Sequence, residues 1–557
     1  MKQYKSLLFQ CYKSFSFYEK TLVGFISFGL LLLLFQGIIY PPNNWDSLTY
    51  HMSRIMYWLS NESVAHFPSH ILRHLYQPPF AEYFILHLNL LNGNDYLSNS
   101  VQWLFLVFSI ISIWSLLDYF KVSRFYKLLV AFLILTIPAV ELQSSTTKND
   151  IVCGFFIITA IYFSCKSYYE SELKNFVFLG LTVGLGLLTK GTAYIFLTPI
   201  LLLLALFILF KIIKTKQIKP LLNGCITLLI VFLINLGHYS RNFKINRNVL
   251  NIDETEAKAY SNEKMNGTLF LSNFLKNAGL HLGYPIQAEA DSLIKGIHKK
   301  ISIPVNNPET NYYGIPYEGA IKINTNEDCA PNVIHFFLIL LSFFALGFNR
   351  FKNLKENKKQ LLLGLIIIAQ LVLFVGYLKW QPWHTRLHIP IFMLSVVLIT
   401  VAANQSKWFK YIVLASIPLM MFSFYFYFVY NNTRPISTNR EYTKNIHLLD
   451  NRFKKYFSNQ PHLYGEYSEV LGAIYSNNST KIGLMLSDWE YPLLYNFYYY
   501  PIKIVAVNVN NCTSGIPQNT ENIDAIIANN QKTDFIIFQG RKYINQNPNH
   551  SYIWFYK

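Results

Sequence analysis

Long apolar runs alternate with short polar breaks through most of the first 430 residues. A helix needs about 20 residues to cross the ~30 Å hydrocarbon layer of a bilayer. Eleven runs of that kind, some of them short, occur at residues 22–40, 100–118, 127–141, 150–166, 175–191, 193–211, 220–238, 333–349, 361–379, 387–403 and 409–430. This pattern predicts a polytopic α-helical membrane protein with about 11 spans.

Three longer polar segments, residues 41–99, 239–332 and 431–557, interrupt or follow these runs. The last of them changes character, because short apolar stretches alternate there with polar breaks. We expect strands at residues 481–486, 502–509 and 535–538, and helices at 489–499 and 523–529. The alternation predicts a small α/β domain at 431–557, after a transmembrane domain at 1–430 that carries the loops 41–99 and 239–332.

Composition supports a membrane protein. Of the 557 residues, 52% are hydrophobic and only 14% are charged, which is too little polar surface for an ordinary soluble core. The net charge of +18 comes from Lys and Arg in short clusters between the apolar runs. That placement indicates topology and contact with membrane lipids rather than a nucleic-acid partner.

The basic clusters also predict the orientation. With a cytoplasmic N-terminus, the clusters fall into the inside loops and the short outside loops carry few basic residues. Lys2, Lys5, Lys13 and Lys20 precede the first run, which has no small-residue cleavage site, so we expect a retained anchor. The inside clusters include Lys121, Arg124, Lys127, Lys166, Lys174, Lys211, Lys214, Lys216, Lys219, Arg350, Lys352, Lys355, Lys358, Lys359, Lys407 and Lys410. The prediction is a multi-pass protein of the plasma (inner) membrane with its C-terminal domain exported.

No metal site is indicated. The six cysteines, at positions 11, 153, 165, 225, 329 and 512, lack metal-ligand spacing, and the histidines lack a pattern such as H-E-x-x-H. Cys329 and Cys512 are the pair expected on the exported side, and the sequence leaves open whether they form a disulfide.

Asp46 follows the first apolar run and opens an amphipathic stretch with Tyr50, His51 and Arg54. An aspartate at such a place is often only a helix cap. Here the polar neighbours gather near the first turn of a helix that we expect to lie on the membrane surface. We therefore treat Asp46 as a candidate catalytic carboxylate.

Three further charged residues are predicted at the same exported boundary. Asp150 precedes the fourth run, Lys190 interrupts Leu187–Gly191 between two spans, and Arg386 precedes the tenth run. Asp150 is explained equally well as a helix cap, and the two cations as residues that reach phospholipid head groups. A carboxylate at membrane depth is costly, and cations converging on it suit an anionic phosphate leaving group.

The stretch from Arg73 to Tyr83 has a basic pair before Pro78 and Pro79. Two prolines end one interfacial helix and start the next, so a packed corner is the simplest interpretation. Alternatively, Arg73 and Tyr76 line a sugar or phosphate pocket.

These residues together resemble a known family. The order Asp46, Tyr76-Gln77-Pro78-Pro79, Thr147-Lys148-Asn149-Asp150, Gly184 to Gly191, and Arg386 before Pro390 is similar to the GT-C superfamily of integral-membrane glycosyltransferases. The branch it resembles most contains bacterial relatives of protein mannosyltransferases and the aminoarabinose transferase of lipid A. The resemblance covers roughly residues 20–240, with a weaker echo near 376–395.

The resemblance implies a GT-C-like fold and a hexosyl- or pentosyltransferase with a polyprenyl-phosphate sugar as donor. It implies no cofactor and a metal-independent or weakly metal-dependent transfer. The general base falls at Asp46, a supporting acid at Asp150, and donor-phosphate contacts at Lys190 and Arg386. In one departure, the family often has Asp-Glu before a Tyr, whereas this chain has Asp46, Ser47 and then Tyr50.

The residues favour transfer at the exported face, with inversion, to a cell-envelope lipid, glycan or protein. Tyr50, His51, Arg54, Arg73 and Tyr76 are candidates for donor phosphate or sugar binding. Two alternatives remain open: a polysaccharide polymerase or ligase with a diphosphate-linked donor, and a lipid-linked sugar transporter or flippase. A transporter favours polar residues at mid-membrane and repeated halves, which this sequence lacks. The sequence does not identify the sugar, the acceptor or the oligomeric state.

Overall fold

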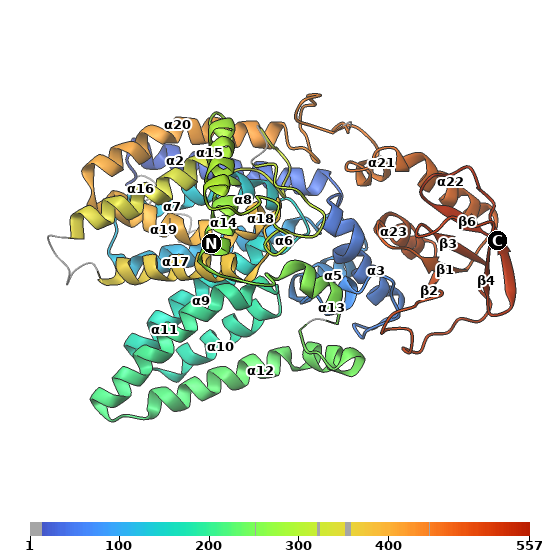
Figure 1. The fold of residues 1–557 in the computed structure, drawn as a ribbon, viewed down its shortest axis with the longest axis horizontal. Helices are drawn as coiled ribbons and strands as arrows, with labels where there is room; N and C mark the ends of the chain where they lie inside the picture. Colours follow the sequence, from blue (N-terminus) through green and yellow to red (C-terminus); the bar gives the residue numbers. More distant parts are fainter. Residues whose placement is uncertain (1–13, 251, 320–322, 351–357, 445) are drawn as a thin grey trace, which may run out of the picture.

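The structure, a computed structural model, describes residues 14–250, 252–319, 323–350, 358–444 and 446–557 (Figure 1). Lys2, Lys5 and Lys13 of the predicted anchor, and also Cys11, Lys352 and Lys355, lie outside the described residues.

Each of the eleven predicted runs contains a helix. The helices are α2 (Phe17–Ile39), α6 (Ser100–Leu117), α7 (Arg124–Leu135), α9 (Asp150–Glu170), α10 (Leu173–Leu187), α11 (Thr192–Thr215), α12 (Lys219–Asn246), α16 (Val333–Arg350), α17 (Lys358–Tyr377), α19 (Ile389–Gln405) and α20 (Lys407–Val429). Among the described residues, seven helices are long and apolar enough to cross a membrane, and α10, α16 and α19 are shorter apolar helices. The chain is a polytopic helical membrane protein, as predicted.

One predicted span is wrong in detail. The run 127–141 is not continuous, because α7 ends at Leu135 and α8 (Pro138–Gln143) starts after a break. Pro138 lacks a backbone N–H, and its ring excludes the helical backbone before it. The short helix α8 then carries the chain into the polar stretch that holds Lys148 and Asp150.

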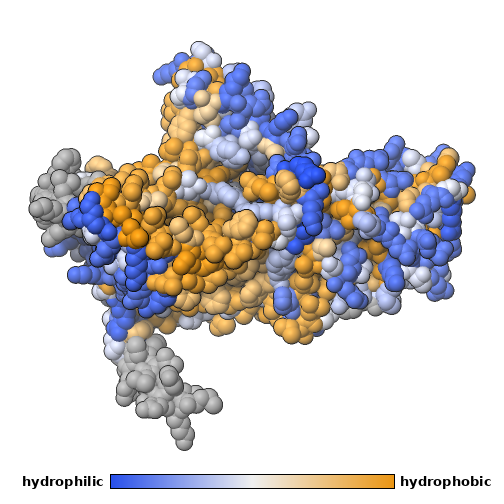
Figure 2. Space-filling model, turned by 90° about the horizontal axis from the view of Figure 1, so that it is seen from below, coloured by the Kyte–Doolittle hydropathy of each residue, from blue (hydrophilic) through white to orange (hydrophobic). Residues whose placement is uncertain are grey.

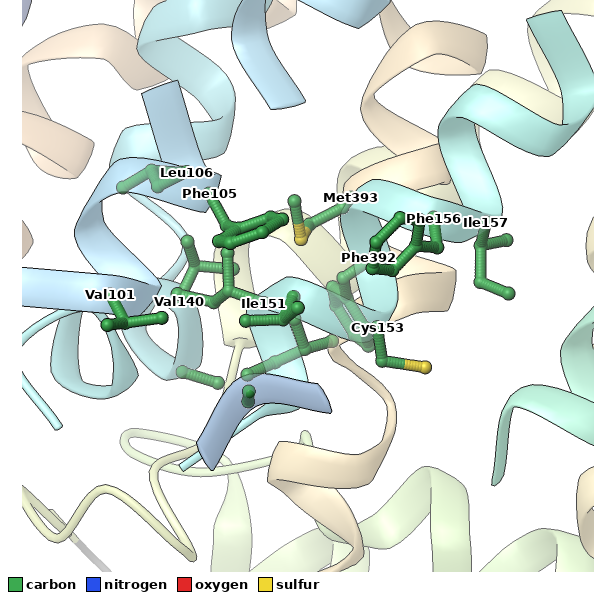
Figure 3. Close-up of a cluster of buried hydrophobic side chains, with 14 of the residues drawn as sticks. Val101, Phe105, Leu106, Val140, Ile151, Cys153, Phe156, Ile157, Phe392 and Met393 are labelled. Carbon is green, nitrogen blue, oxygen red and sulfur yellow. The ribbon is translucent and has the colours of Figure 1, made fainter. Parts of the chain in front are cut away.

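Helix α9 lies in the centre of the bundle. Phe105 of α6, Ile151 and Phe156 of α9, and Phe392 and Met393 of α19 form a buried apolar cluster there (Figure 3). Burial of this kind anchors the first residue of α9, Asp150, at a fixed depth. The outer helices instead turn apolar side chains outward, and Figure 2 shows that hydrophobic residues cover much of the helical part.

The first two polar segments form short helices at one end of the bundle. Residues 41–99 contain the π-helix η1 (Ser47–His51), α3 (Met52–Ser60), α4 (Arg73–Tyr76) and α5 (Phe80–Asn92). Residues 239–332 contain α13 (Glu254–Tyr260), α14 (Gly267–Gly279) and α15 (Gln287–Lys300). Hydrogen bonds from Arg73 to Glu256 and from Thr325 to the Tyr442 carbonyl join all three polar segments. The segments therefore gather at one end, whereas the membrane orientation stays a prediction.

The C-terminal segment is a small α/β unit (Figure 1). It contains α21 (Arg452–Tyr456), α22 (Leu463–Ser476), β1 (Lys481–Met485), α23 (Tyr491–Tyr499), β2 (Lys503–Ala506), β3 (Ala525–Ala528), β4 (Phe535–Phe538), β5 (Arg541–Ile544) and β6 (Trp554–Tyr556). The sheet order is β2-β1-β3-β6, with β1 parallel to both neighbours and β6 antiparallel, and β4 and β5 form a separate hairpin.

The helix predicted at residues 523–529 is wrong, because these residues contain strand β3. Its four residues are all buried between β1 and β6, so they form a continuous apolar run without the alternation that marks a half-exposed strand. Cys329 and Cys512 are both free. The division of the chain at residue 430 stays a prediction.

The α/β unit is docked on the first polar segment through a buried carboxylate. Asp95 is fully buried and accepts hydrogen bonds from Arg452 at 2.5 Å, Tyr456 at 2.6 Å and Tyr491 at 3.0 Å. Three partners satisfy the charge of the carboxylate in a dry place. Ser458 and Asn459 of the unit also donate to the carbonyl of Asn43, so the unit contacts the turn that holds Asp46 as well.

Candidate active site

A cavity of ≈ 570 Å³ lies among the first polar segment, α13 and the nearby ends of α11, α12 and α17. Six of the nine candidate residues line it: Asp46, Tyr50, Arg73, Tyr76, Lys190 and Arg386. The remaining walls are largely aromatic and apolar, with Tyr260 and Trp383 on one side and Ile195 and Leu373 among the others. The volume suits a small polar group attached to an apolar chain.

Asp46 is held at the cavity by the turn around it. Asn44 Oδ1 accepts hydrogen bonds from the backbone N–H and the hydroxyl of Ser47, and the Ser47 hydroxyl lies 2.5 Å from that of Thr147. The π-helix η1 begins at Ser47, directly after Asp46, and π-turns of this kind are frequent at functional sites.

Two cations approach the Asp46 carboxylate. Arg386 Nη1 donates to Oδ2 over 2.5 Å, and Lys148 Nζ lies 3.8 Å from the same oxygen. Burial opposes ionisation, but the charges of Arg386 and Lys148 outweigh it and hold the pKa of Asp46 well below its usual range. Burial and the nearby Asp46 carboxylate raise the pKa of the Tyr50 phenol, which therefore keeps its proton.

A second carboxylate, Asp328, shares both cations. Arg386 Nη1 lies 3.2 Å from Asp328 Oδ1, and Lys148 donates directly to the same oxygen. Sequence reasoning missed Asp328. The available signal was its position, since it lies five residues before α16 as Asp150 lies at the start of α9, so both acids stand at the same end of the bundle.

Asp150 lies behind the cavity wall. Its side chain is 1% exposed, and Lys190 Nζ donates to its Oδ1 over 2.7 Å and to Asn149 Oδ1 over 3.0 Å. The first turn of α9 favours a negative charge at this position. Lys190 lines the cavity and Asp150 does not, so Asp150 acts on the cavity through Lys190.

His51 and Arg54 are not among the residues that line the cavity. Glu82 of α5 lies 2.5 Å from His51 Nδ1 and 3.6 Å from Arg54 Nη2, and all three side chains are buried. Arg54 also donates to the carbonyl of Gln77. Both residues therefore support the Gln77-Pro78-Pro79 corner. Neither is placed to contact a sugar donor bound in the cavity.

Arg73 and Tyr76 meet a carboxylate that sequence reasoning did not connect to them. Both donate to Glu256 of α13, and Arg73 Nη2 also donates to the Tyr260 hydroxyl over 3.0 Å. Helix α13 thus covers the cavity at the side of α4. Nothing in the sequence spacing relates positions 73 and 256.

The charges of the site balance. The cations Arg386, Lys148, Lys190 and Arg73 meet the carboxylates Asp46, Asp328, Asp150 and Glu256. An anionic ligand therefore competes with carboxylates that already contact each of these cations. Among the residues that the structure describes, no three His, Cys, Asp or Glu side chains are grouped to hold a metal ion, and metal dependence stays a prediction.

Comparisons with known proteins find a related family and a similar fold. Residues 76–238 match the family described as dolichyl-phosphate-mannose-protein mannosyltransferase, and the chain as a whole has the fold of one solved structure. The resemblance expected from the sequence is confirmed.

That solved structure is the crystal structure of ArnT from Cupriavidus metallidurans bound to undecaprenyl phosphate, with a TM-score of 0.54, 9% sequence identity, and coverage of 96% of this chain and 98% of that chain. No curated protein matches the sequence.

Proposed function

We propose that this protein transfers a sugar from a polyprenyl-phosphate donor to a hydroxyl group of a cell-envelope lipid, glycan or protein. One observation carries the proposal: the Asp46 carboxylate shares a single cavity with Lys190 and Arg386. The apolar side chains of Ile195 and Leu373 line the same cavity. A lipid-linked sugar needs this combination, because its phosphate and its prenyl chain require opposite surroundings.

In the proposed reaction Asp46 is the general base. It takes the proton of the acceptor hydroxyl while the acceptor oxygen forms a bond to the anomeric carbon of the sugar. The bond from that carbon to the phosphate oxygen breaks, and its electron pair leaves with the polyprenyl phosphate. Attack opposite the phosphate inverts the anomeric configuration. A positioned base of this kind typically contributes ~100-fold to ~10,000-fold in rate.

Arg386 and Lys190 bind the phosphate in this proposal. Their charges stabilise the negative charge that grows on the leaving oxygen, and a single such donor is worth about 3–4 kcal/mol in favourable cases. Arg386 offers a fork of donors that fits two phosphate oxygens, and Lys190 offers a compact point charge. Asp150 positions Lys190, and Tyr50, Arg73 and Tyr76 line the side of the cavity near α4.

The expected location of this reaction is the exported face of the plasma (inner) membrane. The N-terminus is then cytoplasmic, and the three polar segments and the α/β unit stand outside. This placement brings the cavity to the boundary where the bilayer meets the outer compartment, which a donor phosphate reaches while its prenyl chain stays in lipid.

The test uses purified protein in detergent with a panel of polyprenyl-phosphate sugars and an envelope extract as acceptor. We expect release of polyprenyl phosphate together with a glycosylated acceptor of inverted anomeric configuration, read by NMR. Transfer only from diphosphate-linked donors overturns the proposed donor class. Retention of configuration overturns the direct attack.

A further inference from the structure

Asp328 and Asp46 contact the same two cations, Lys148 and Arg386, at different distances. Lys148 donates directly to Asp328, whereas its Nζ lies 3.8 Å from Asp46 Oδ2. Arg386 shows the opposite preference, at 2.5 Å from Asp46 and 3.2 Å from Asp328. Each carboxylate therefore has its own principal cation, and each cation lies within reach of the other carboxylate.

Lys148 is almost completely shielded from solvent. Its side chain is 1% exposed, and it lies in the polar stretch between α8 and α9. An ammonium group buried to this extent must stay beside a carboxylate, because the cost of leaving it unpaired is several kcal/mol. Its alternatives within this cluster are Asp328 and Asp46.

The resting arrangement makes Asp46 a weak base. The two cations stabilise its ionised form, and both approach Oδ2, so Oδ1 is the oxygen that remains to accept a proton. A donor phosphate that takes Arg386, as in the proposed function, removes one of these cations. The basicity of Asp46 in the donor complex then depends on where Lys148 goes.

We propose that Asp328 is a positioning residue that retains Lys148 when the donor phosphate takes Arg386, so that the Asp46 carboxylate is free to accept the proton of the acceptor. This inference rests on the proposed function and deepens it. Donor binding and activation of the base become one event, because the same phosphate occupies Arg386 and uncovers Asp46.

The groups that face Asp46 come from several elements. They are Arg386 of α18 (His384–Leu387), Lys148 before α9, Asp328 before α16, Tyr50 and His51 of η1, and Arg73 of α4. His51 is paired with Glu82, and Arg73 is paired with Glu256. Neither His51 nor Arg73 therefore depends on Asp328 for a partner. Lys148 is the cation whose position Asp328 controls.

The test measures kcat against pH, over about pH 4 to 8, for transfer from a saturating polyprenyl-phosphate donor. In Asp328→Asn, Lys148 moves to Asp46 and lowers its pKa in the donor complex. The acid limb, the part of the profile where kcat rises with pH as Asp46 loses its proton, is expected to shift down by about one pH unit. We expect kcat to fall roughly threefold to tenfold. The KM for the donor changes less than about twofold, because Arg386 keeps its closer contact to Asp46 and Lys190 does not contact Asp328.

Lys148→Gln is expected to shift the acid limb in the opposite direction, upward, because Asp46 loses a cation while the Asp328 charge stays. The double variant Asp328→Asn/Lys148→Gln recovers part of the lost kcat and brings the limb back between those of the single variants. Asp118→Asn and Lys127→Gln, which alter an ion pair at the far end of α6, are matched controls expected to leave the limb in place.

A merely structural role for Asp328 lowers activity in every variant without opposite shifts, and that result overturns the inference. If Asp328→Asn does not fold, Lys148→Gln alone decides, because an unmoved limb in that variant also overturns it. Absence of transfer by the wild-type protein from any polyprenyl-phosphate sugar is a different failure, that of the proposed function. Wild-type transfer with coinciding pH profiles is the failure of the inference alone.

Discussion

Arg386 and Asp46 are 340 positions apart in the sequence, and a 2.5 Å hydrogen bond joins Nη1 of the arginine to Oδ2 of the aspartate. This contact connects the link between α17 and α19 to the turn that follows α2. It keeps the carboxylate ionised at neutral pH and at the same time occupies one of its oxygens. Oδ2 of Asp46 is therefore occupied in the resting site, and an anionic ligand that binds Arg386 would release this oxygen.

Asp46→Asn is expected to abolish transfer, with kcat lowered by about 100-fold to 10,000-fold. Asparagine keeps the size of the side chain and accepts a hydrogen bond from Arg386, but it cannot take a proton from the acceptor. Donor binding, measured by isothermal titration with a polyprenyl phosphate, stays the same or tightens, because the neutral amide holds Arg386 less strongly than the carboxylate does. Asp118→Asn is the control for the chemical change, and turnover of Asp46→Asn near that of the wild type removes Asp46 from the mechanism.

Lys190→Met is expected to raise the KM for the donor roughly tenfold, since a charge-assisted hydrogen bond worth about 1.5 kcal/mol is lost. The same change leaves Asp150 buried without its cation and lowers the free energy of unfolding by about 3 kcal/mol. The added variant Asp150→Asn separates the two effects. In the double variant the thermal midpoint recovers while the KM does not, and recovery of both assigns Lys190 a structural role only.

The helices and the outer boundary of the site could be predicted from the sequence because the bilayer imposes a length that apolar runs must satisfy. The same rule located Asp46, Asp150, Lys190 and Arg386, each at the end of such a run. It failed at residues 127–141, where Pro138 divides the run into two helices. It does not apply to the α/β unit, and there the buried strand at 525–528 has no alternation that distinguishes it from a helix.

The partners of the charged residues could not be predicted, because ion pairing depends on how distant segments pack. His51 lies close to Asp46 in the sequence, yet its ring contacts Glu82 and it is not among the residues that line the cavity. Asp328 has no local pattern of its own, and its function arises only where its segment meets Lys148 and Arg386. The position of a carboxylate at the end of a span was enough to select it as a candidate site residue. It was not enough to predict what that residue does.

Glu490→Gln is expected to stabilise the protein. Glu490 lies where the α/β unit meets α3, is 2% exposed, and accepts a hydrogen bond from Tyr57 over 3.3 Å. His74 lies 3.5 Å away but donates to the Thr49 carbonyl, and burial lowers its pKa to about 3, so it brings no positive charge. Burial therefore raises the pKa of Glu490 well above its usual value.

The sign of the pH dependence follows from that shift. A carboxyl whose folded pKa exceeds its unfolded pKa contributes stability fully below the unfolded value and loses it as the pH rises through the folded value. Glutamine keeps the Tyr57 bond and has no charge to bury, so the gain at pH 8 is on the order of 1–3 kcal/mol and disappears near pH 4. Thermal unfolding across this range measures it, with the exposed Glu469→Gln as control, and an equal gain at both pH values contradicts the explanation.

Gly184→Ala is expected to loosen the contact between α10 and α12. Gly180 and Gly184 form a small-residue pair one turn apart, which lets two membrane helices approach closely. A Cβ at Gly184 would lie 2.7 Å from Ile234 Cδ1 and 3.3 Å from Val231 Cα, and the backbone atom cannot move aside as a side-chain end can. We expect a loss of about 1–3 kcal/mol in unfolding free energy. Gly224→Ala on α12 is the matched control, because nothing lies within 4 Å of its added Cβ.

Equal thermal midpoints for the two variants in detergent would show that α10 and α12 are held together by other contacts. A lower midpoint for Gly184→Ala alone supports close helix packing as the support for Lys190, which follows α10 directly in the chain.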